Sequence, residues 1–111
     1  MRQIFISQLM RGKSDERIKA EREALTDYAR TKFGIDVQII DSFFEGAPAH
    51  KKPIWFLGKS IEKLADAESI LMSPDWQEGK GCKIEHDVAL SYGIEVVYAP
   101  NNVYDGILKK L

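Results

Sequence analysis

The stretch ESILMSPDWQEGKGCKIEHDVALSYGIEVVY, residues 68–98, decides the fold of this chain. It opens with the short apolar run 68–72 and closes with a second one, 94–98, and both are typical of strands buried on two faces. Between them, residues 82–92 have the spacing of a helix. The stripe with this spacing consists of Ile84, Val88 and Tyr92. A strand, a helix and a strand in this order predict a crossover connection between parallel strands.

The same alternation runs through the whole chain. The other expected elements are strands at 3–7 and 36–40 and helices at 15–33, 54–66 and 103–111. Ser14 is suited to cap the helix that follows it, and Gly34 is suited to end that helix. The order β-α-β-α-β-α-β-α predicts one α/β domain, residues 1–111, in which a sheet of four to five mainly parallel strands has helices on both faces.

Composition and charge argue against several classes of function. The net charge is −1, and basic and acidic residues are mixed along the chain, which argues against a surface for nucleic-acid polymers. No apolar run approaches the roughly 18 to 20 residues that span a bilayer. MRQIFISQ lacks the layout of a signal peptide, so we expect a cytoplasmic protein. Cys82, the only cysteine, makes a poor metal set with His50 and His86, and we expect no metal or other cofactor.

The loops at the carboxyl ends of the strands are the expected working edge, because ligands of open parallel sheets bind there. These loops are 7–13, 42–53, 73–81 and 98–102. They hold most of the aromatic and charged residues that a simple connection would not need, namely Arg11, Phe43, Phe44, Glu45, Asp75 and Trp76. The loops at the opposite end are short and plain.

Glu85 is the first candidate for chemistry. If its helix starts near Gly81 or Cys82, Glu85 lies in or beside the first turn, where free N–H groups favour an acidic residue for structural reasons alone. The functional alternative is a carboxylate held against a ligand, because Gly79 and Gly81 let the backbone come close. Asp75 faces the same mouth, and two carboxylates across a pocket can divide the work of cleaving a glycosidic bond.

The connection SQLMRGKSD, residues 7–15, is the second candidate. Its polar residues precede a helix N-terminus, which is a ready anion site, and Arg11 can hold a phosphate or carboxylate with two hydrogen bonds. The residues that would contact a ligand here are Ser7, Gln8, Arg11, Gly12 and Ser14. No complete dinucleotide or triphosphate loop is present. An ordinary capped turn explains the same residues equally well.

The aromatic residues have competing interpretations. Phe43 and Phe44 can stack on a base or fold back over the core, and Trp76 can form a pocket wall. Trp55 and Phe56 suit a core or a subunit contact better. Solvated or capping roles suit His50 and His86, and Cys82 is most simply a small buried residue.

Several of these stretches resemble a known family. FISQLMRGKSDERIKAERE, DSFFEGAP, WFLGKSIEKL and DWQEGKGCKIEHDVALSYGIEVVY are similar to a group of small phage and bacterial proteins. That group is placed with the nucleoside 2-deoxyribosyltransferase superfamily, which includes 2′-deoxynucleoside 5′-monophosphate N-glycosidases. The resemblance covers nearly the whole chain and implies a three-layer, flavodoxin-like (doubly wound) α/β fold.

The resemblance also implies roles for individual residues. In the superfamily, the Glu of a Gly-x-x-x-Glu motif attacks C1′ of the deoxyribose, so Glu85, four residues after Gly81, inherits the role of nucleophile. An Arg-Gly pair in the first loop implies phosphate binding by Arg11 and the glycine after it. The related glycosidases have a tyrosine where this chain has Phe5, and a catalytic aspartate near the position of Ser60. Asp75 or Glu45 would have to replace that aspartate.

Three hypotheses follow. The first is an enzyme that cleaves or transfers the N-glycosidic bond of a deoxynucleoside or its monophosphate, with Glu85 as nucleophile and Asp75 assisting it. In that hypothesis Arg11 and Ser14 hold the phosphate or sugar hydroxyls, while Phe44 and Trp76 flank the base. The second is a nucleotide-binding or sensing protein without chemistry. The third is a protein that contacts another chain through its aromatic loop. A homodimer or larger homo-oligomer is expected from the resemblance.

Overall fold

The computed structural model describes residues 2–40 and 51–108. Its strands are β1 (Gln3–Ser7), β2 (Gln38–Ile40), β3 (Ser69–Met72) and β4 (Glu95–Tyr98). Its helices are α1 (Asp15–Phe33), α2 (Pro53–Leu64), the 3-10 turn η1 (Trp76–Glu78), α3 (Lys80–Ser91) and α4 (Asp105–Leu108). The predicted alternation of strands and helices is confirmed, with boundaries that differ by a few residues.

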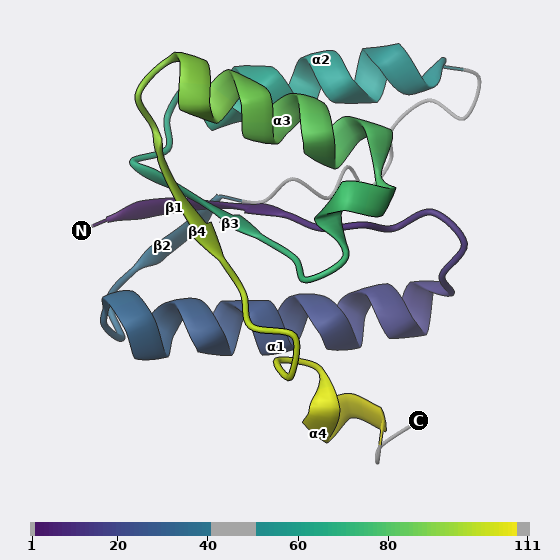
Figure 1. The fold of residues 1–111 in the computed structure, drawn as a ribbon, viewed down its shortest axis with the longest axis vertical. Coiled ribbons are helices and arrows are strands. Elements are labelled where there is room, and N and C mark those ends of the chain that lie inside the picture. The colour runs from purple at the N-terminus through teal and green to yellow at the C-terminus, as the bar shows by residue number, and fades with distance from the viewer. Residues whose placement is uncertain (1, 41–50, 109–111) are drawn as a thin grey trace.

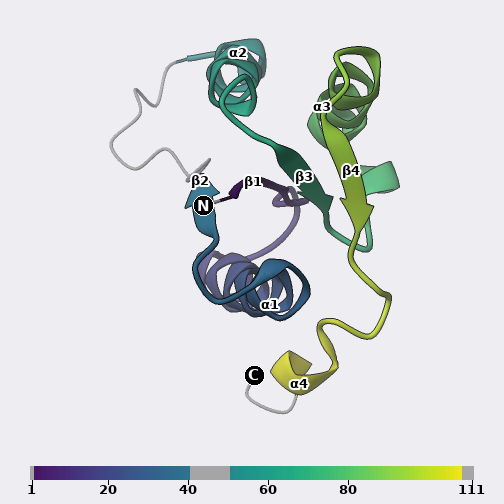
Figure 2. The same ribbon diagram turned by 90° about the vertical axis from the view of Figure 1, so that its left-hand side faces the viewer.

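The four strands form one parallel sheet in the order β2-β1-β3-β4. Helix α1 covers one face, and α2 and α3 cover the other, so the molecule has three layers (Figures 1 and 2). This confirms the flavodoxin-like α/β fold. The connection from β1 leads outward to β2, whereas the chain returns through α2 to β3 on the other side of β1. The strand order therefore reverses between β1 and β3, and the carboxyl ends of such a pair are where α/β sheets bind ligands.

Strand β1 sends alternate side chains to the two faces, as the period of a strand requires. Ile4 and Ile6 pack with Leu25 of α1 in one core cluster. Phe5 packs with Leu64 of α2 in the other. Because Ser7 is two residues after Phe5, it lies on the face that α2 and α3 cover.

Helix α1 shows how local sequence sets an element. The side chain of Ser14 accepts a hydrogen bond from the N–H of Arg17 over 3.1 Å, which confirms the predicted cap. Gly34 ends the helix with a φ of 115°, in a region that side chains disfavour. The buried apolar residues of α1 are Ile18, Leu25 and Ala29.

Two details of the sequence prediction are wrong. The stripe Ile84, Val88 and Tyr92 does not face the core, since Ile84 and Tyr92 are exposed; the buried residues of α3 are Cys82, Glu85, His86 and Ala89. The final helix begins at Asp105 instead of residue 103, and residues 109–111 of the predicted helix lie outside the described residues. Most of the long loop predicted at 42–53 lies outside the described residues.

Candidate functional site

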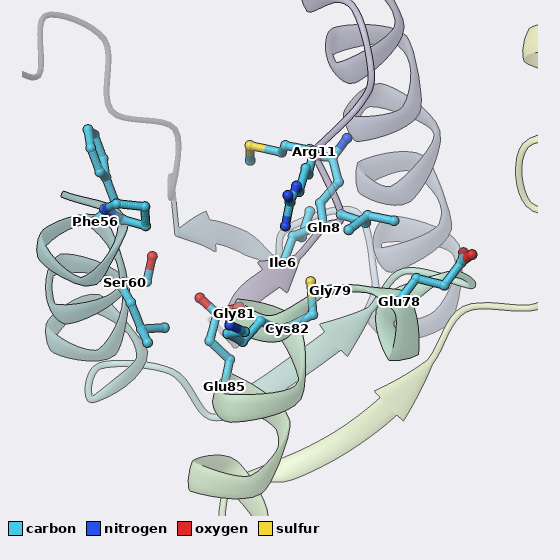
Figure 3. A pocket seen from close by; sticks show the side chains of 15 residues that line it. Ile6, Gln8, Arg11, Phe56, Ser60, Glu78, Gly79, Gly81, Cys82 and Glu85 are labelled. Atoms are coloured by element: carbon cyan, nitrogen blue, oxygen red, sulfur yellow. The ribbon is translucent and has the colours of Figure 1, made fainter. Parts of the chain in front are cut away.

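A cleft of about 830 Å³ lies where the strand order reverses. Its walls come from the connection after β1, from α2 and from the start of α3. Figure 3 shows Phe56 and Ser60 on α2 at one side and Arg11 at the other, with Glu85 reaching in from α3. Among the lining residues are Ile6, Gln8, Leu9, Met10, Arg11, Pro53, Phe56, Leu57, Ser60, Glu78, Gly79, Lys80, Gly81, Cys82 and Glu85.

Glu85 is a buried carboxyl at the base of this cleft, with 8% of its surface exposed. Its Oε1 accepts a hydrogen bond of 2.7 Å from the hydroxyl of Ser7. Burial raises the pKa of Glu85 above its ordinary value, and the hydrogen bonds from Ser7 and Ser60 lower it only in part. The carboxyl of Glu85 therefore lines the cleft while it is largely shielded from bulk solvent.

The helix-start interpretation of Glu85 is wrong. Helix α3 begins at Lys80, so Glu85 lies in its second turn and no acidic residue occupies the first. The free N–H groups at the helix start consequently do not account for this carboxyl. What holds it is the hydroxyl of Ser7 on β1, together with Ser60 on α2.

Ser60 lies where the resemblance implies an aspartate. It is buried and lines the cleft, and its hydroxyl acts to lower the pKa of Glu85. Phe5, where the resemblance implies a tyrosine, is fully buried in the core beneath α2 and α3. The hydroxyls of Ser7 and Ser60 therefore lie beside Glu85, and Phe5 contributes no polar group to its surroundings.

Cys82 also faces the cleft, and its thiol stays protonated at neutral pH. Burial raises its pKa to about 11, although a hydrogen bond with Ser7 acts in the opposite direction. A thiol with this pKa is a poor nucleophile. The sequence interpretation of Cys82 as a small buried residue agrees with its 6% exposure.

The cleft has a cationic rim. Arg11 and Lys80 both line it and both are exposed. Gly79 occupies the N-cap of α3, no side chain caps the N–H groups of the first turn, and the residues of that turn line the cleft. This combination of charges and free N–H groups is suited to an anion such as a phosphate. Glu78 is the acidic residue on this rim.

The two glycines at the start of α3 differ in their surroundings. A Cβ on Gly79 would lie 2.9 Å from Cδ1 of Leu9 and 3.3 Å from Sγ of Cys82. A Cβ on Gly81 would meet only Cδ1 of Leu57, at 4.0 Å. Gly79 is thus needed for packing, whereas the space beside Gly81 is open to the cleft.

Asp75 does not line the cleft with Glu85. Its Oδ2 forms an ion pair of 2.6 Å with Nζ of Lys13, and Oδ1 accepts a hydrogen bond from Ser73. Lys13 also pairs with Glu21 over 2.7 Å, and Arg17 reaches the other oxygen of Glu21. Asp75 is therefore one member of a structural ion-pair network.

The pKa of Lys13 shows that the opposite charges of this network stabilise one another. Burial lowers the pKa of Lys13, but the hydrogen bonds and charges of Asp75 and Glu21 outweigh it and leave the pKa raised. Sequence analysis missed Glu21, which is 2% exposed. The signal was present, because position 21 lies on the helical face of Ile18 and Leu25.

The other predicted residues have varied positions. Trp76 does not line the cleft; it stacks on His86 with 4.1 Å between ring centroids. His86 lies 2.7 Å from the hydroxyl of Tyr98, so it has a partner that the sequence did not indicate. Gly12 has a φ of 81° and shapes the turn, and Ser14 caps α1. Phe43, Phe44, Glu45 and His50 lie outside the described residues.

Of the predicted site residues, five line the cleft, namely Gln8, Arg11, Gly79, Gly81 and Glu85. Ser7 does not line it and is buried behind Glu85, to which it donates a hydrogen bond. The cleft adds apolar walls from Leu9, Met10, Phe56 and Leu57, which sequence reasoning did not assign to a site. Within residues 2–40 and 51–108, no group of three His, Cys, Asp or Glu side chains is placed to hold a metal ion. No helix in these ranges is long and apolar enough to cross a membrane.

These features define an α/β protein with a parallel sheet and a cleft at the point where the strand order reverses, with the carboxyl of Glu85 at the base of the cleft. The sequence profile of the family described as "Domain of unknown function (DUF4406)" matches residues 2–98, and the chain belongs to this family. The matched range includes every residue of the cleft. No curated protein and no solved structure matches the chain.

Proposed function

We propose that the cleft binds a deoxynucleoside 5′-monophosphate and that Glu85 attacks its N-glycosidic bond, in hydrolysis or in deoxyribosyl transfer. The observation that carries the proposal is the position of Glu85, a buried carboxyl at the base of a cleft and hydrogen bonded to Ser7. The resemblance to nucleoside 2-deoxyribosyltransferases assigns the nucleophile to the same residue.

In the proposed reaction, an ionised oxygen of Glu85 forms a bond to C1′ while the bond from C1′ to the base nitrogen breaks. The base leaves with the electron pair and takes up a proton. Water, or a second base, then attacks C1′ and releases Glu85. The hydroxyls of Ser7 and Ser60 assist by stabilising the ionised carboxylate, since hydrogen bonds from both lower its pKa.

The remaining walls of the cleft suit the rest of a nucleotide. Arg11, Lys80 and the first turn of α3 offer positive charge and free N–H groups for the 5′-phosphate. Phe56, Leu57 and Met10 offer apolar surface for a base. In this arrangement the sugar lies between rim and floor, with C1′ over Glu85.

A second function, nucleotide binding without turnover, is favoured by the residues around Glu85. Ser60 contributes a hydroxyl where the related enzymes have an aspartate, and Phe5 contributes none where they have a tyrosine. Asp75 is engaged by Lys13 and so is not free to replace the aspartate. A buried carboxyl with a raised pKa can also serve as a hydrogen-bonding group in a sensor.

Incubation with the four deoxynucleoside monophosphates separates these functions. The enzyme releases free base, and Glu85→Gln abolishes that release while thermal stabilisation by the nucleotide persists. Glu62→Gln, an exposed substitution on α2, is the matched control and leaves release unchanged. Stabilisation without release by wild type identifies the binding protein, and in that case Ser60→Asp should introduce slow release. Absence of both stabilisation and release contradicts both functions.

The proposal carries two further expectations from the resemblance. The protein is expected to act in the cytoplasm, where deoxynucleotides are present, and to form a homodimer or larger homo-oligomer. Sedimentation of the purified chain tests the second expectation.

A further inference from the structure

The two oxygens of the Asp75 carboxylate hold both ends of the loop that carries Arg11. Oδ2 accepts a hydrogen bond of 2.6 Å from Nζ of Lys13, which follows Arg11 by two residues. Oδ1 accepts a hydrogen bond of 2.9 Å from the hydroxyl of Ser73. The oxygen of that hydroxyl in turn accepts a hydrogen bond of 3.3 Å from the N–H of Leu9, which precedes Arg11 by two residues. Arg11 thus lies midway between two tethers that meet at a single carboxylate.

The segment between these tethers is a tight turn with Arg11 at its tip. The N–H of Lys13 donates a hydrogen bond of 3.2 Å to the carbonyl oxygen of Met10, and Gly12 has a φ of 81°. A glycine with positive φ in the third position is typical of a type II turn, which places Arg11 in the second position. Because so short a turn moves together with its ends, the direction of Arg11 depends on where the tethers hold Leu9 and Lys13.

Asp75 also belongs to the segment that forms the other part of the cationic rim. Its carbonyl oxygen accepts a hydrogen bond of 3.1 Å from the N–H of Glu78 in η1, and η1 leads directly to Gly79 at the N-cap of α3. Lys80 and the uncapped first turn of α3 line the same cleft as Arg11. Asp75 therefore connects the two groups of donors that suit an anion.

The tethers are suited to holding a geometry because they are shielded from water. The side chain of Lys13 is 7% exposed and that of Asp75 is 22% exposed, while Ser73 is fully buried. Nζ of Lys13 also pairs with Glu21 over 2.7 Å, which joins the end of the loop to α1. Charge-assisted hydrogen bonds of this kind are short and strong, whereas exposed ion pairs contribute little.

We propose that Asp75 is a positioning residue that holds Arg11 at the distance from the first turn of α3 at which both bind one phosphate group. This inference rests on the proposed function, which places the 5′-phosphate of the nucleotide at this rim. Asp75 acts through Arg11 and does not itself line the cleft. It increases the affinity for the phosphate because Arg11 is already in place when the ligand arrives, so less binding free energy is lost in ordering the loop.

The affinity ratio between a deoxynucleoside monophosphate and the deoxynucleoside with the same base tests this inference. Calorimetry measures both affinities in a parent protein that carries Glu85→Gln, so that no ligand is consumed. We expect Asp75→Asn to reduce the ratio about tenfold, the effect of one misplaced charge-assisted hydrogen bond. Asp66→Asn, an exposed substitution just after α2, should leave the ratio unchanged. A purely structural role of Asp75 would lower stability without changing the relative affinity of two ligands that differ only in the phosphate.

A double-mutant cycle shows whether Asp75 acts through Arg11. Arg11→Ala should itself reduce the ratio, and the addition of Asp75→Asn should then cause little further reduction. Equal reductions by Asp75→Asn in the presence and in the absence of Arg11 would overturn the inference, because Asp75 would then act on another part of the rim.

A second variant protects the test against misfolding. Ser73→Ala removes the tether to Leu9 and keeps the ion pair of Asp75 with Lys13, so it should reduce the ratio by less than Asp75→Asn does. An unchanged ratio in folded Asp75→Asn, or in Ser73→Ala if Asp75→Asn does not fold, overturns the inference and leaves the proposed function intact. Failure of all four deoxynucleoside monophosphates to bind overturns the inference together with the proposed function.

Discussion

The hydroxyl of Ser7 donates a hydrogen bond of 2.7 Å to Oε1 of Glu85, and the two residues are 78 positions apart in the sequence. One is the last residue of β1 and the other lies in the second turn of α3. The strand order reverses between β1 and β3, and the contact joins β1 to α3, the helix that follows β3. It therefore links the architecture of the sheet directly to the group that the proposed function uses.

Replacing Glu85 should stabilise the protein at neutral pH. Because burial raises the folded pKa of Glu85 above its ordinary value of 4.5, the folded protein binds more protons than the unfolded chain between pH 4.5 and that raised pKa. The stability that this group contributes is fully present below pH 4.5 and is lost as the pH rises through the folded pKa. Glu85→Gln should gain about 1 kcal/mol at pH 8, as is usual when a functional group is removed from a buried site.

Urea unfolding at pH 8 and at pH 4 measures this gain. The difference between Glu85→Gln and wild type should shrink at the lower pH, whereas Glu62→Gln should show no such gain at pH 8. A loss of stability in Glu85→Gln at pH 8 would show that the site favours the charged form.

Removing the hydroxyl of Ser60 should raise the pKa of Glu85 further. Its hydrogen bond is one of the two interactions that lower this pKa, so Ser60→Ala leaves burial less opposed. Carbon-13 NMR of the glutamate carboxyls, with Glu85→Gln identifying the resonance, follows the titration directly. A titration midpoint of Glu85 that is unchanged or lower in Ser60→Ala would contradict the prediction.

Breaking the ion pairs of Lys13 should cost about 3 kcal/mol, because a buried carboxylate loses its closer and more buried partner and keeps only the half-exposed Arg17. Glu21, which is 2% exposed, is that carboxylate in Lys13→Met. Chemical denaturation measures the loss. Lys59→Met, which removes only an exposed ion pair with Glu62, should cost less than about 1 kcal/mol.

The double variant Lys13→Met/Glu21→Leu completes this test. It removes both members of the buried pair, so it should recover part of the stability that Lys13→Met loses. If the double variant loses as much stability as Lys13→Met and Glu21→Leu lose together, the two charges are not coupled.

The two glycines at the start of α3 should respond differently to alanine. Gly81→Ala should stabilise the protein by about 0.5 to 1 kcal/mol, because its Cβ meets nothing closer than 4.0 Å and alanine favours the helix. Gly79→Ala should not stabilise the protein in this way, because the side chains of Leu9 and Cys82 must shift to make room for the new Cβ.

The effect of Gly81→Ala on nucleotide binding should be opposite to its effect on stability. Its new methyl group narrows the cleft beside the rim, so Gly81→Ala should weaken nucleotide binding while thermal melting shows higher stability. If binding is unchanged, the ligand does not approach the backbone at this glycine.

Much of the fold could be predicted from the sequence because its signals are local. Apolar runs marked the strands, Ser14 capped α1, and Gly34 ended it, each through contacts within a few residues. The hydrophobic stripe predicted for α3 is not its buried face, and the reason also lies in the local character of the signal. Hydrophobic spacing finds the buried face only when that face is apolar, and the buried face of α3 carries Glu85 and His86.

The candidate site was only partly predictable. Position along the chain was enough to place Glu85, Arg11 and Gln8 at the carboxyl edge of the sheet, because parallel strands bring their following loops together. It was not enough to separate Glu85 from Asp75, since both follow the same strand. The difference arises from Lys13, which forms an ion pair with Asp75, and Asp75 does not line the cleft.

The sequence by itself determined the alternation of strands and helices and the edge of the sheet where polar residues collect, because strand period, helix spacing and capping act over a few neighbouring residues. Only the tertiary structure decided that the carboxyl of Glu85 lines the cleft and that the carboxyl of Asp75 is neutralised in an ion pair. That choice depends on partners far apart in the chain, Ser7 for Glu85 and Lys13 for Asp75, which come within hydrogen-bonding distance only when the sheet has formed.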